Sequence, residues 1–189
     1  MNNERIASGF LIAYKENVSV PTTAEEKSKW RWKLIILSWF AALGVDFIWH
    51  GGVLAEIYSH PHPAILDSMQ LFIRIPFGYL SFFLQAVFLY WFASYLQLHN
   101  WKDGLKFGFI AGCVMGIASV LGQYSVLTVE LFVLILWGIG QLLGFLIMGA
   151  VFGAGKSVDS LRNLTKKVAA FVAVMLILGI ILQNMLIQL

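Results

Sequence analysis

The stretch VDFIWHGGVLAEIYSHPHP, residues 45–63, holds the side chains best suited to chemistry in this chain. Asp46 and His50 are four residues apart, so they share one face of a helix. An aspartate placed in this way can orient a histidine for metal binding or for proton transfer. The same contact can also serve only to rigidify a helical bundle. The spacing therefore leaves a chemical and a structural interpretation open.

Three histidines of this stretch, His50, His60 and His62, are candidate ligands for zinc or copper. The prolines on either side of His62 favour extended backbone, which places His60 and His62 on similar sides of the chain. No thiolate accompanies them, and their spacing does not match that of a structural zinc site. Metal binding is a hypothesis at this point, and the sequence predicts no bound cofactor.

Glu56 and Arg74 are the other charged residues that we expect near Asp46 and His50. Arg74 lies inside an apolar run, where an unpaired charge is costly, so we expect an ion pair with Asp46 or with Glu56. Pairing with Asp46 keeps this aspartate ionised, whereas pairing with Glu56 leaves Asp46 able to titrate. The sequence predicts a polar cluster of these four residues and leaves both pairings open.

The composition of the chain indicates that this cluster belongs to a membrane protein. The 189 residues are 59% hydrophobic and 12% charged, whereas a soluble domain has about 25% charged residues. A hydrocarbon core of about 30 Å needs about 20 apolar residues in a helix. Five stretches meet this requirement: residues 33–53, 71–96, 107–127, 131–153 and 168–186. We predict an all-α, polytopic bundle of five transmembrane helices over residues 31–189.

Residues 1–30 are expected to form a separate N-terminal segment at the cytoplasmic face of the membrane. Apolar residues between Ile6 and Tyr14 lie along one helical stripe, which predicts a short interfacial helix. Thr23 followed by Glu26 matches a capping box, so we expect the first long helix to begin near Ala24.

The distribution of Lys and Arg predicts the orientation in the bilayer. All of the 13 basic residues except Arg74 lie in the N-terminal segment or in the loops that follow the second and fourth spans. These regions share one side of five crossings, so the positive-inside rule places the N-terminus in the cytoplasm and the C-terminus outside. No basic run interleaved with aromatic residues lies outside the spans, which excludes a nucleic-acid-binding surface.

Glycine residues repeat along the third and fourth predicted spans, where they allow helix backbones to approach closely. The glycines concerned are Gly104, Gly108, Gly112, Gly116, Gly140 and Gly144. Packing within the chain is the main interpretation, and a contact between copies is the alternative. Gln85 and Gln141 lie well inside their spans, and we expect them to form hydrogen bonds between helices.

The stretch LGVDFIWHGGVLAEIY, in which Asp-Phe is followed two residues later by His-Gly, resembles the first helix of a family of uncharacterised small bacterial membrane proteins. WKDGLKFGFIAG and LWGIGQLLGFLIMGAVFGAG are similar to the later glycine-rich helices of the same family. The resemblance extends over residues 34–156. It implies a multi-pass helical bundle of the bacterial inner membrane and no assigned catalytic residues.

Two functional classes fit these observations. In the first, the protein is a structural or accessory component that associates, within the lipid bilayer, with itself or with another membrane protein. In the second, it binds or transports a small solute, ion or metal through an outward-facing polar pocket formed by Asp46, His50, Glu56 and Arg74. The small number of charges in the spans favours the first class. No catalytic set of nucleophile, base and orienting group is visible, so we do not expect an enzyme.

Overall fold

The computed structural model describes residues 23–59, 66, 68–158 and 160–187, and its secondary structure in these ranges is helical. The elements are α2 (Ala24–Asp46), η1 (Phe47–Val53), α3 (Ala55–Ser59), α4 (Ser68–Tyr95), α5 (Trp101–Tyr124), α6 (Leu131–Lys156) and α7 (Leu161–Ile187). Five helical stretches are long and apolar enough to cross a bilayer. This confirms the predicted all-α bundle. The predicted interfacial helix near the N-terminus lies outside the described residues.

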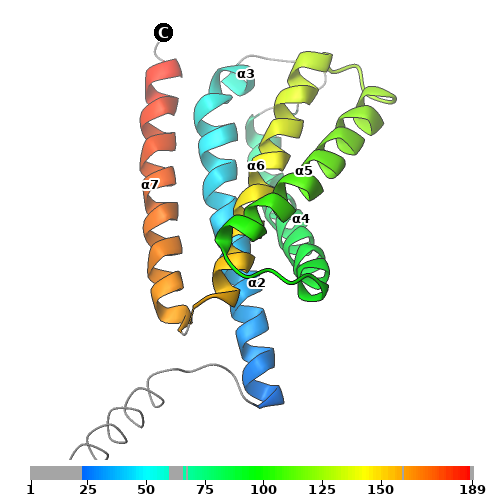
Figure 1. Ribbon diagram of the computed structural model, residues 1–189. Helices are drawn as coiled ribbons and strands as arrows, with labels where there is room; N and C mark the ends of the chain where they lie inside the picture. Colours follow the sequence, from blue (N-terminus) through cyan, green and yellow to red (C-terminus); the bar gives the residue numbers. More distant parts are fainter. Residues whose placement is uncertain (1–22, 60–65, 67, 159, 188–189) are drawn as a thin grey trace, which may run out of the picture.

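The five long helices run in alternate directions through one bundle (Figure 1). α6 is the central helix, because it contacts α2, α4, α5 and α7. The main core lies along α6, where Phe145, Met148 and Phe152 are almost fully buried. Leu34 and Ile35 of α2 belong to the same core.

The first helix begins where the sequence predicts. The side chain of Thr23 accepts a hydrogen bond from the backbone N–H of Glu26, and the Glu26 carboxylate accepts one from the backbone N–H of Thr23. This capping box satisfies N–H groups that have no partner within the helix, so α2 starts at Ala24.

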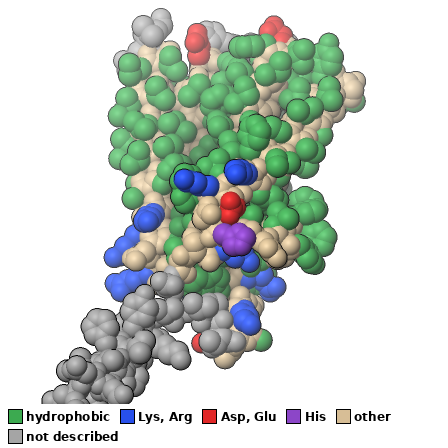
Figure 2. Space-filling model, viewed as in Figure 1, with side chains coloured by type: hydrophobic (Ala, Val, Ile, Leu, Met, Phe, Trp, Pro, Cys, Tyr) green, Lys and Arg blue, Asp and Glu red, His purple; other side chains and the backbone are tan. Residues whose placement is uncertain are grey.

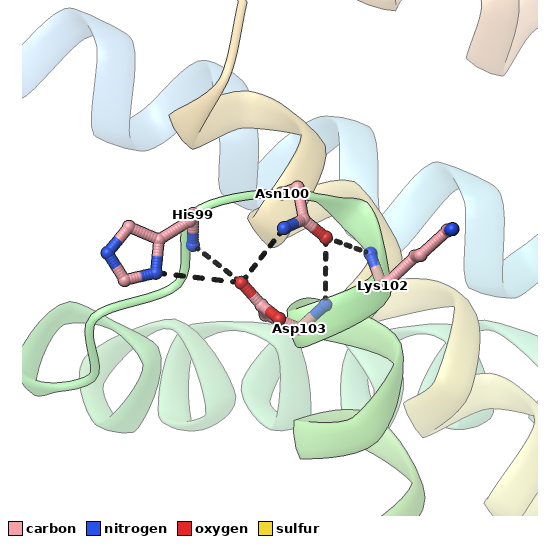
Figure 3. A network of polar contacts seen from close by, with 4 residues as sticks. All are labelled: His99, Asn100, Lys102 and Asp103. Atoms are coloured by element: carbon pink, nitrogen blue, oxygen red, sulfur yellow. Dashed lines mark hydrogen bonds and ion pairs between the residues drawn. The ribbon is translucent and has the colours of Figure 1, made fainter.

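The start of α5 is capped by a second polar network (Figure 3). Asn100 Oδ1 accepts hydrogen bonds from the backbone N–H groups of Lys102 and Asp103. Asp103 Oδ2 accepts from the backbone N–H of His99 and from the Asn100 side chain. The network fixes the short connection from α4 to α5. It also places the Asn100 carbonyl against Gly153 of α6, where any side chain would overlap it.

Basic side chains gather at one end of the bundle, which we call the basic end. It is formed by the first turns of α2, α5 and α7 and by the last turn of α6. Figure 2 shows Lys and Arg in the lower part of the face, with a hydrophobic surface above them. Among the described residues, Arg74 is the basic residue that lies away from the basic end. Glu56 and Glu130 lie toward the opposite end of the bundle.

The glycines of α5 face α6, and there the backbones of the two helices are in direct contact. Gly104, Gly108, Gly112 and Gly116 are all buried. A Cβ atom at Gly104 would overlap the carbonyl oxygen of Gly149, and one at Gly108 would overlap the carbonyl oxygen of Phe145. The repeat therefore packs two helices of the same chain together, as in other membrane bundles in which small residues allow close contact.

α4 is attached to the bundle much more loosely. Ala86, Leu89 and Ala93 are buried against the core. The first half of the helix is exposed, including Phe72 and Phe77. α4 has contacts with α2 and α6 but no substantial contact with α5.

We predict that Gly108→Ala lowers the free energy of unfolding by about 1–3 kcal/mol, because the added methyl group overpacks the contact with α6. Gly122→Ala in the same helix is the matched control, since a Cβ atom there meets nothing within 4 Å. The control is expected to be neutral or slightly stabilising, because alanine favours a helix more than glycine does. Thermal unfolding of both variants in the same detergent tests this, and equal midpoints would contradict the packing described.

Candidate functional site

The first span does not end as a regular α-helix. α2 continues directly into the π-helix η1, in which the backbone N–H of Leu54 bonds to the carbonyl of Trp49, five residues earlier, at 2.9 Å. Segments of π-helix are rare and occur frequently at functional sites. The apolar pattern of the sequence gives no sign of this change of helix type. It alters the direction of every side chain that follows Asp46.

One face of η1 lies against the backbone of α7. A Cβ atom at Gly52 would lie 3.2 Å from the Cα of Gly179, and a Cβ at Gly179 would lie 2.8 Å from the ring of Phe47. Two glycines therefore allow the π-helix and α7 to touch. This contact holds η1 in place from the side opposite the polar residues.

The other face of η1 lies against α6 at Gly140. The indole N–H of Trp49 donates to the carbonyl of Leu136 at 2.9 Å. A Cβ atom at Gly140 would lie only 2.6 Å from Trp49 Cδ1 and 3.1 Å from His50 Nε2. Gly140 therefore creates the space that Trp49 and His50 occupy. Gly144, one turn further, lies beside Phe82 of α4.

Four side chains, from the end of α2, η1, α3 and α6, form a polar chain. His50 Nδ1 lies 2.7 Å from the hydroxyl of Tyr58. The same hydroxyl accepts a hydrogen bond of 2.8 Å from the indole N–H of Trp137. On the other side of the imidazole, His50 Nε2 lies 3.7 Å from Asp46 Oδ1, which is longer than a hydrogen bond. We call Asp46, His50, Tyr58 and Trp137 the polar chain.

The Trp137 indole can only donate, and this determines which group donates in each hydrogen bond of the polar chain. Trp137 can only donate, so the Tyr58 hydroxyl accepts from it and has its own proton to give to His50 Nδ1. A neutral imidazole that accepts at Nδ1 carries its proton on Nε2, which faces the Asp46 carboxylate. This arrangement places a donor opposite the acidic group.

The polar chain is partly open. The side chains of His50 and Asp46 are 29% and 23% exposed. Burial raises the pKa of Tyr58 to about 12, against a smaller lowering effect of the Trp137 hydrogen bond and a further increase from the Asp46 charge. The phenol is therefore protonated at neutral pH and available as a hydrogen-bond donor.

Arg74 does not join this site, so the expected Asp46–Arg74 ion pair is absent. Its side chain is exposed on α4, and no carboxylate within the described residues forms an ion pair with it. The reason is rotational, since Arg74 lies roughly 90° around α4 from the stripe that contacts the bundle. Glu56 lies on α3 with an exposed side chain. The four residues predicted to line one pocket thus do not converge around Asp46.

Of the three histidines proposed as metal ligands, only His50 lies within the described residues. His60 and His62 lie outside the described residues. Within the described ranges, no three His, Cys, Asp or Glu side chains come together as a potential metal site. Asp46 and His50 are adjacent, but they form a pair only.

Gln85 and Gln141 are both half-buried, and neither bridges to another helix among the described residues. Gln85 donates to Ser81 of its own helix at 3.3 Å, and its Oε1 atom is buried without a hydrogen-bond partner. Neither glutamine forms the predicted interhelical bond with another described residue. Gln85 lines a cavity of about 400 Å³ together with Ser81 of α4, Met115 of α5 and Phe145 of α6.

Tyr58 and Trp137 were missed as site residues by the sequence analysis. In a continuous α-helix, Tyr58 would lie roughly 80° around the axis from His50. The π-helix and the irregular backbone at Leu54 remove this offset. The helical periodicity of the sequence therefore did not predict the contact between Tyr58 and His50.

Comparison of the chain with protein-family models, with curated proteins and with solved structures finds no match. The chemical possibilities of the site therefore follow from its geometry. The polar chain can stabilise the junction of η1, α3 and α6, and the Asp46–His50 pair can hold a proton or a small cation.

We predict that Tyr58→Phe lowers the free energy of unfolding by about 1–3 kcal/mol, because it leaves the Trp137 indole N–H and His50 Nδ1 without their shared partner. Tyr124→Phe is the control, since the Tyr124 side chain is exposed. Denaturation in one detergent compares the two variants. A Tyr58→Phe protein as stable as the control would show that the polar chain does not stabilise the fold.

Proposed function

We propose that this protein is an accessory component of the bacterial inner membrane that binds a transmembrane helix of a second membrane protein along α4. Its N-terminus is then cytoplasmic and its C-terminus external. The orientation is supported by the gathering of Lys and Arg at the basic end of the bundle. Asp46, Tyr58 and Arg74 then lie toward the external side.

The observation that carries the proposal is a stripe of small and polar residues on α4. Arg74, Gly78, Ser81 and Gln85 follow one another at spacings of four, three and four residues. They lie within about 60° of one another around the helix. This is the spacing at which membrane helices contact a partner through small and polar side chains. We call these four residues the α4 polar stripe.

Apart from the hydrogen bond between Gln85 and Ser81, the α4 polar stripe has no polar partner among the described residues. A Cβ atom at Gly78 would meet nothing within 4 Å. Arg74 has no ion pair within the described residues, and Gln85 Oε1 is buried without a hydrogen bond. Polar groups at membrane depth are costly when unpaired, so a binding partner that supplies an acid and a donor stabilises the assembly.

A groove at this position offers room for the side chains of a partner helix. This groove is lined by Ser81 and Gln85 of α4. It lies between α4 and α5, and Phe145 of α6 forms its base. The α5 glycines cannot provide a second association face, because they are already packed against α6. This supports α4, rather than the glycine face of α5, as the surface that binds a partner.

The chemistry of the α4 polar stripe favours a different protein over a second copy of this chain. A parallel, two-fold dimer through α4 would bring two Arg74 side chains together near one end of the interface. Like charges at such a contact are destabilising. The expected partner is a membrane helix with Asp or Glu near its external end and a hydrogen-bond donor about 16 Å deeper, opposite Gln85.

We predict that a photo-crosslinking amino acid at Ser81 forms one discrete adduct with another membrane protein in native membranes. The same group at Ile177 of α7, which is also exposed, is the control and is expected to give no discrete adduct. Arg74→Gln should reduce the Ser81 adduct at least about tenfold, because it removes the cation that pairs with the partner. Mass spectrometry identifies the crosslinked peptide.

Three outcomes would contradict this proposal. They are an adduct with a second copy only, an adduct of equal yield from Ile177, and an adduct that Arg74→Gln leaves unchanged. A crosslinked helix without an acidic residue at the depth of Arg74 would also argue against the proposed pairing.

A second candidate function is supported by the polar chain. Asp46 is the last residue of α2 and His50 lies in the π-helix that follows it, and their partly exposed side chains could bind a metal ion or another small cation. We expect His50→Ala to lower the metal content of protein purified with zinc or copper. His99→Ala, at the exposed network of the basic end, is the control. Equal metal content in wild type and His50→Ala would exclude metal binding at His50.

A further inference from the structure

A second cavity lies between α2 and α4 at the basic end. It has a volume of about 680 Å³. Lys27, Ser28 and Arg31 of α2 line one side, and Tyr90 and Ser94 of α4 line the other. Because the two helices are antiparallel, the first turns of α2 meet the last turns of α4 here (Figure 1). The cavity has no role in the polar chain or in the α4 polar stripe.

The two cations of this cavity, Lys27 and Arg31, have no acidic partner in the part of the chain that the structure describes. Lys27 and Arg31 are four residues apart and share one face of α2. Neither forms an ion pair within the described residues, whereas Lys29, on another face of the helix, is paired with Glu25 at 2.6 Å. The Arg31 guanidinium lies 5.8 Å from the ring centroid of Trp32. Two cations without an ion pair among the described side chains thus line the same cavity.

The lining changes from polar to apolar along the cavity. The mouth carries the two cations and the half-buried hydroxyl group of Ser28. Toward the middle of the bundle the lining becomes apolar, with Ile35 of α2 and Val87 of α4. Trp32 and Trp91, both largely exposed, stand beside it. A ligand that fits this gradient carries an anionic head and a hydrocarbon tail.

We propose that this cavity binds an anionic glycerophospholipid, with the phosphate between Lys27 and Arg31 and an acyl chain along Ile35 and Val87. Basic pockets between membrane helices bind acidic headgroups in this way. Exposed tryptophans are typical of the interface at which headgroups lie. The first turn of α2 is capped by Thr23, so the side chains recognise the anion and the helix terminus does not. This site is independent of the helix partner proposed for α4.

The apolar end of the cavity favours a lipid over soluble phosphate. A free phosphate ion needs the cations and the hydroxyl group only, and it gains nothing from Ile35 and Val87. An acyl chain also contacts Val87 and the exposed rings of Trp32 and Trp91, which line the same cavity. Both ligands share the phosphate chemistry, so the experiment must separate them.

The test is native mass spectrometry of the full chain in detergent with phosphatidylglycerol, phosphatidylcholine or inorganic phosphate. We expect retention of phosphatidylglycerol, weaker retention of phosphatidylcholine and no competition by inorganic phosphate. The double variant Lys27→Gln/Arg31→Gln should reduce affinity for phosphatidylglycerol about tenfold or more, because each cation near an anionic headgroup contributes to binding.

Lys29→Gln/Lys33→Gln is the matched control, since it removes the same net charge from the same helix but not from the cavity lining. It should leave retention of phosphatidylglycerol unchanged. An equal loss in both double variants would show general attraction and overturn the site. Equal retention of the two lipids, or competition by inorganic phosphate at millimolar level, would also overturn it.

Binding can also be followed without removing either charge. Lys27→Arg/Arg31→Lys keeps both cations and should keep the preference for phosphatidylglycerol. Phosphatidylglycerol with brominated acyl chains should quench tryptophan fluorescence more in wild type than in Trp91→Phe, because Trp91 borders the cavity. Equal quenching in both proteins would place the acyl chain elsewhere and contradict the proposal.

Discussion

Glycine on two faces of α6 is the constraint on which the rest of the structure depends. On one face, Gly149 meets the backbone of α5 so closely that a side chain would overlap Gly104. On another face, Gly140 leaves room for Trp49 and His50 of the π-helix. Lipid supplies no hydrophobic drive between helices, so close packing must hold the bundle together. These glycines give α6 its closest approaches to α5 and to η1.

The same close packing decides which polar groups are satisfied inside the chain. Contact between η1 and α6 brings His50, Tyr58 and Trp137 within hydrogen-bond distance. α4 packs against the core mainly through the face of Ala86, Leu89 and Ala93, and Arg74 and the Oε1 atom of Gln85 have no partner within the described residues. Unpaired polar groups are much more costly in a membrane than in water. This difference favours a structural role for the polar chain and an intermolecular role for the α4 polar stripe.

Loose attachment of α4 also explains why both proposed binding surfaces border this helix. One of its faces borders the groove toward α5, and another borders the basic cavity toward α2. A hydrogen bond also joins α4 to α2: the indole N–H of Trp39 in α2 donates to the carbonyl of Tyr79 in α4 at 2.9 Å. The helix is thereby positioned without being covered, which leaves its sides accessible to a protein helix and to a lipid.

The sequence by itself determined the five long apolar helices, the start of α2 at its capping box and the shared helix face of Asp46 and His50. These features depend on composition and on spacings of three or four residues, which are local. The π-helix, the meeting of Tyr58 with Trp137 and the separation of Arg74 from Asp46 were decided only by the tertiary structure. They depend on how each helix is rotated toward its neighbours. Periodicity shows which residues share a face, but packing at glycine decides what that face meets.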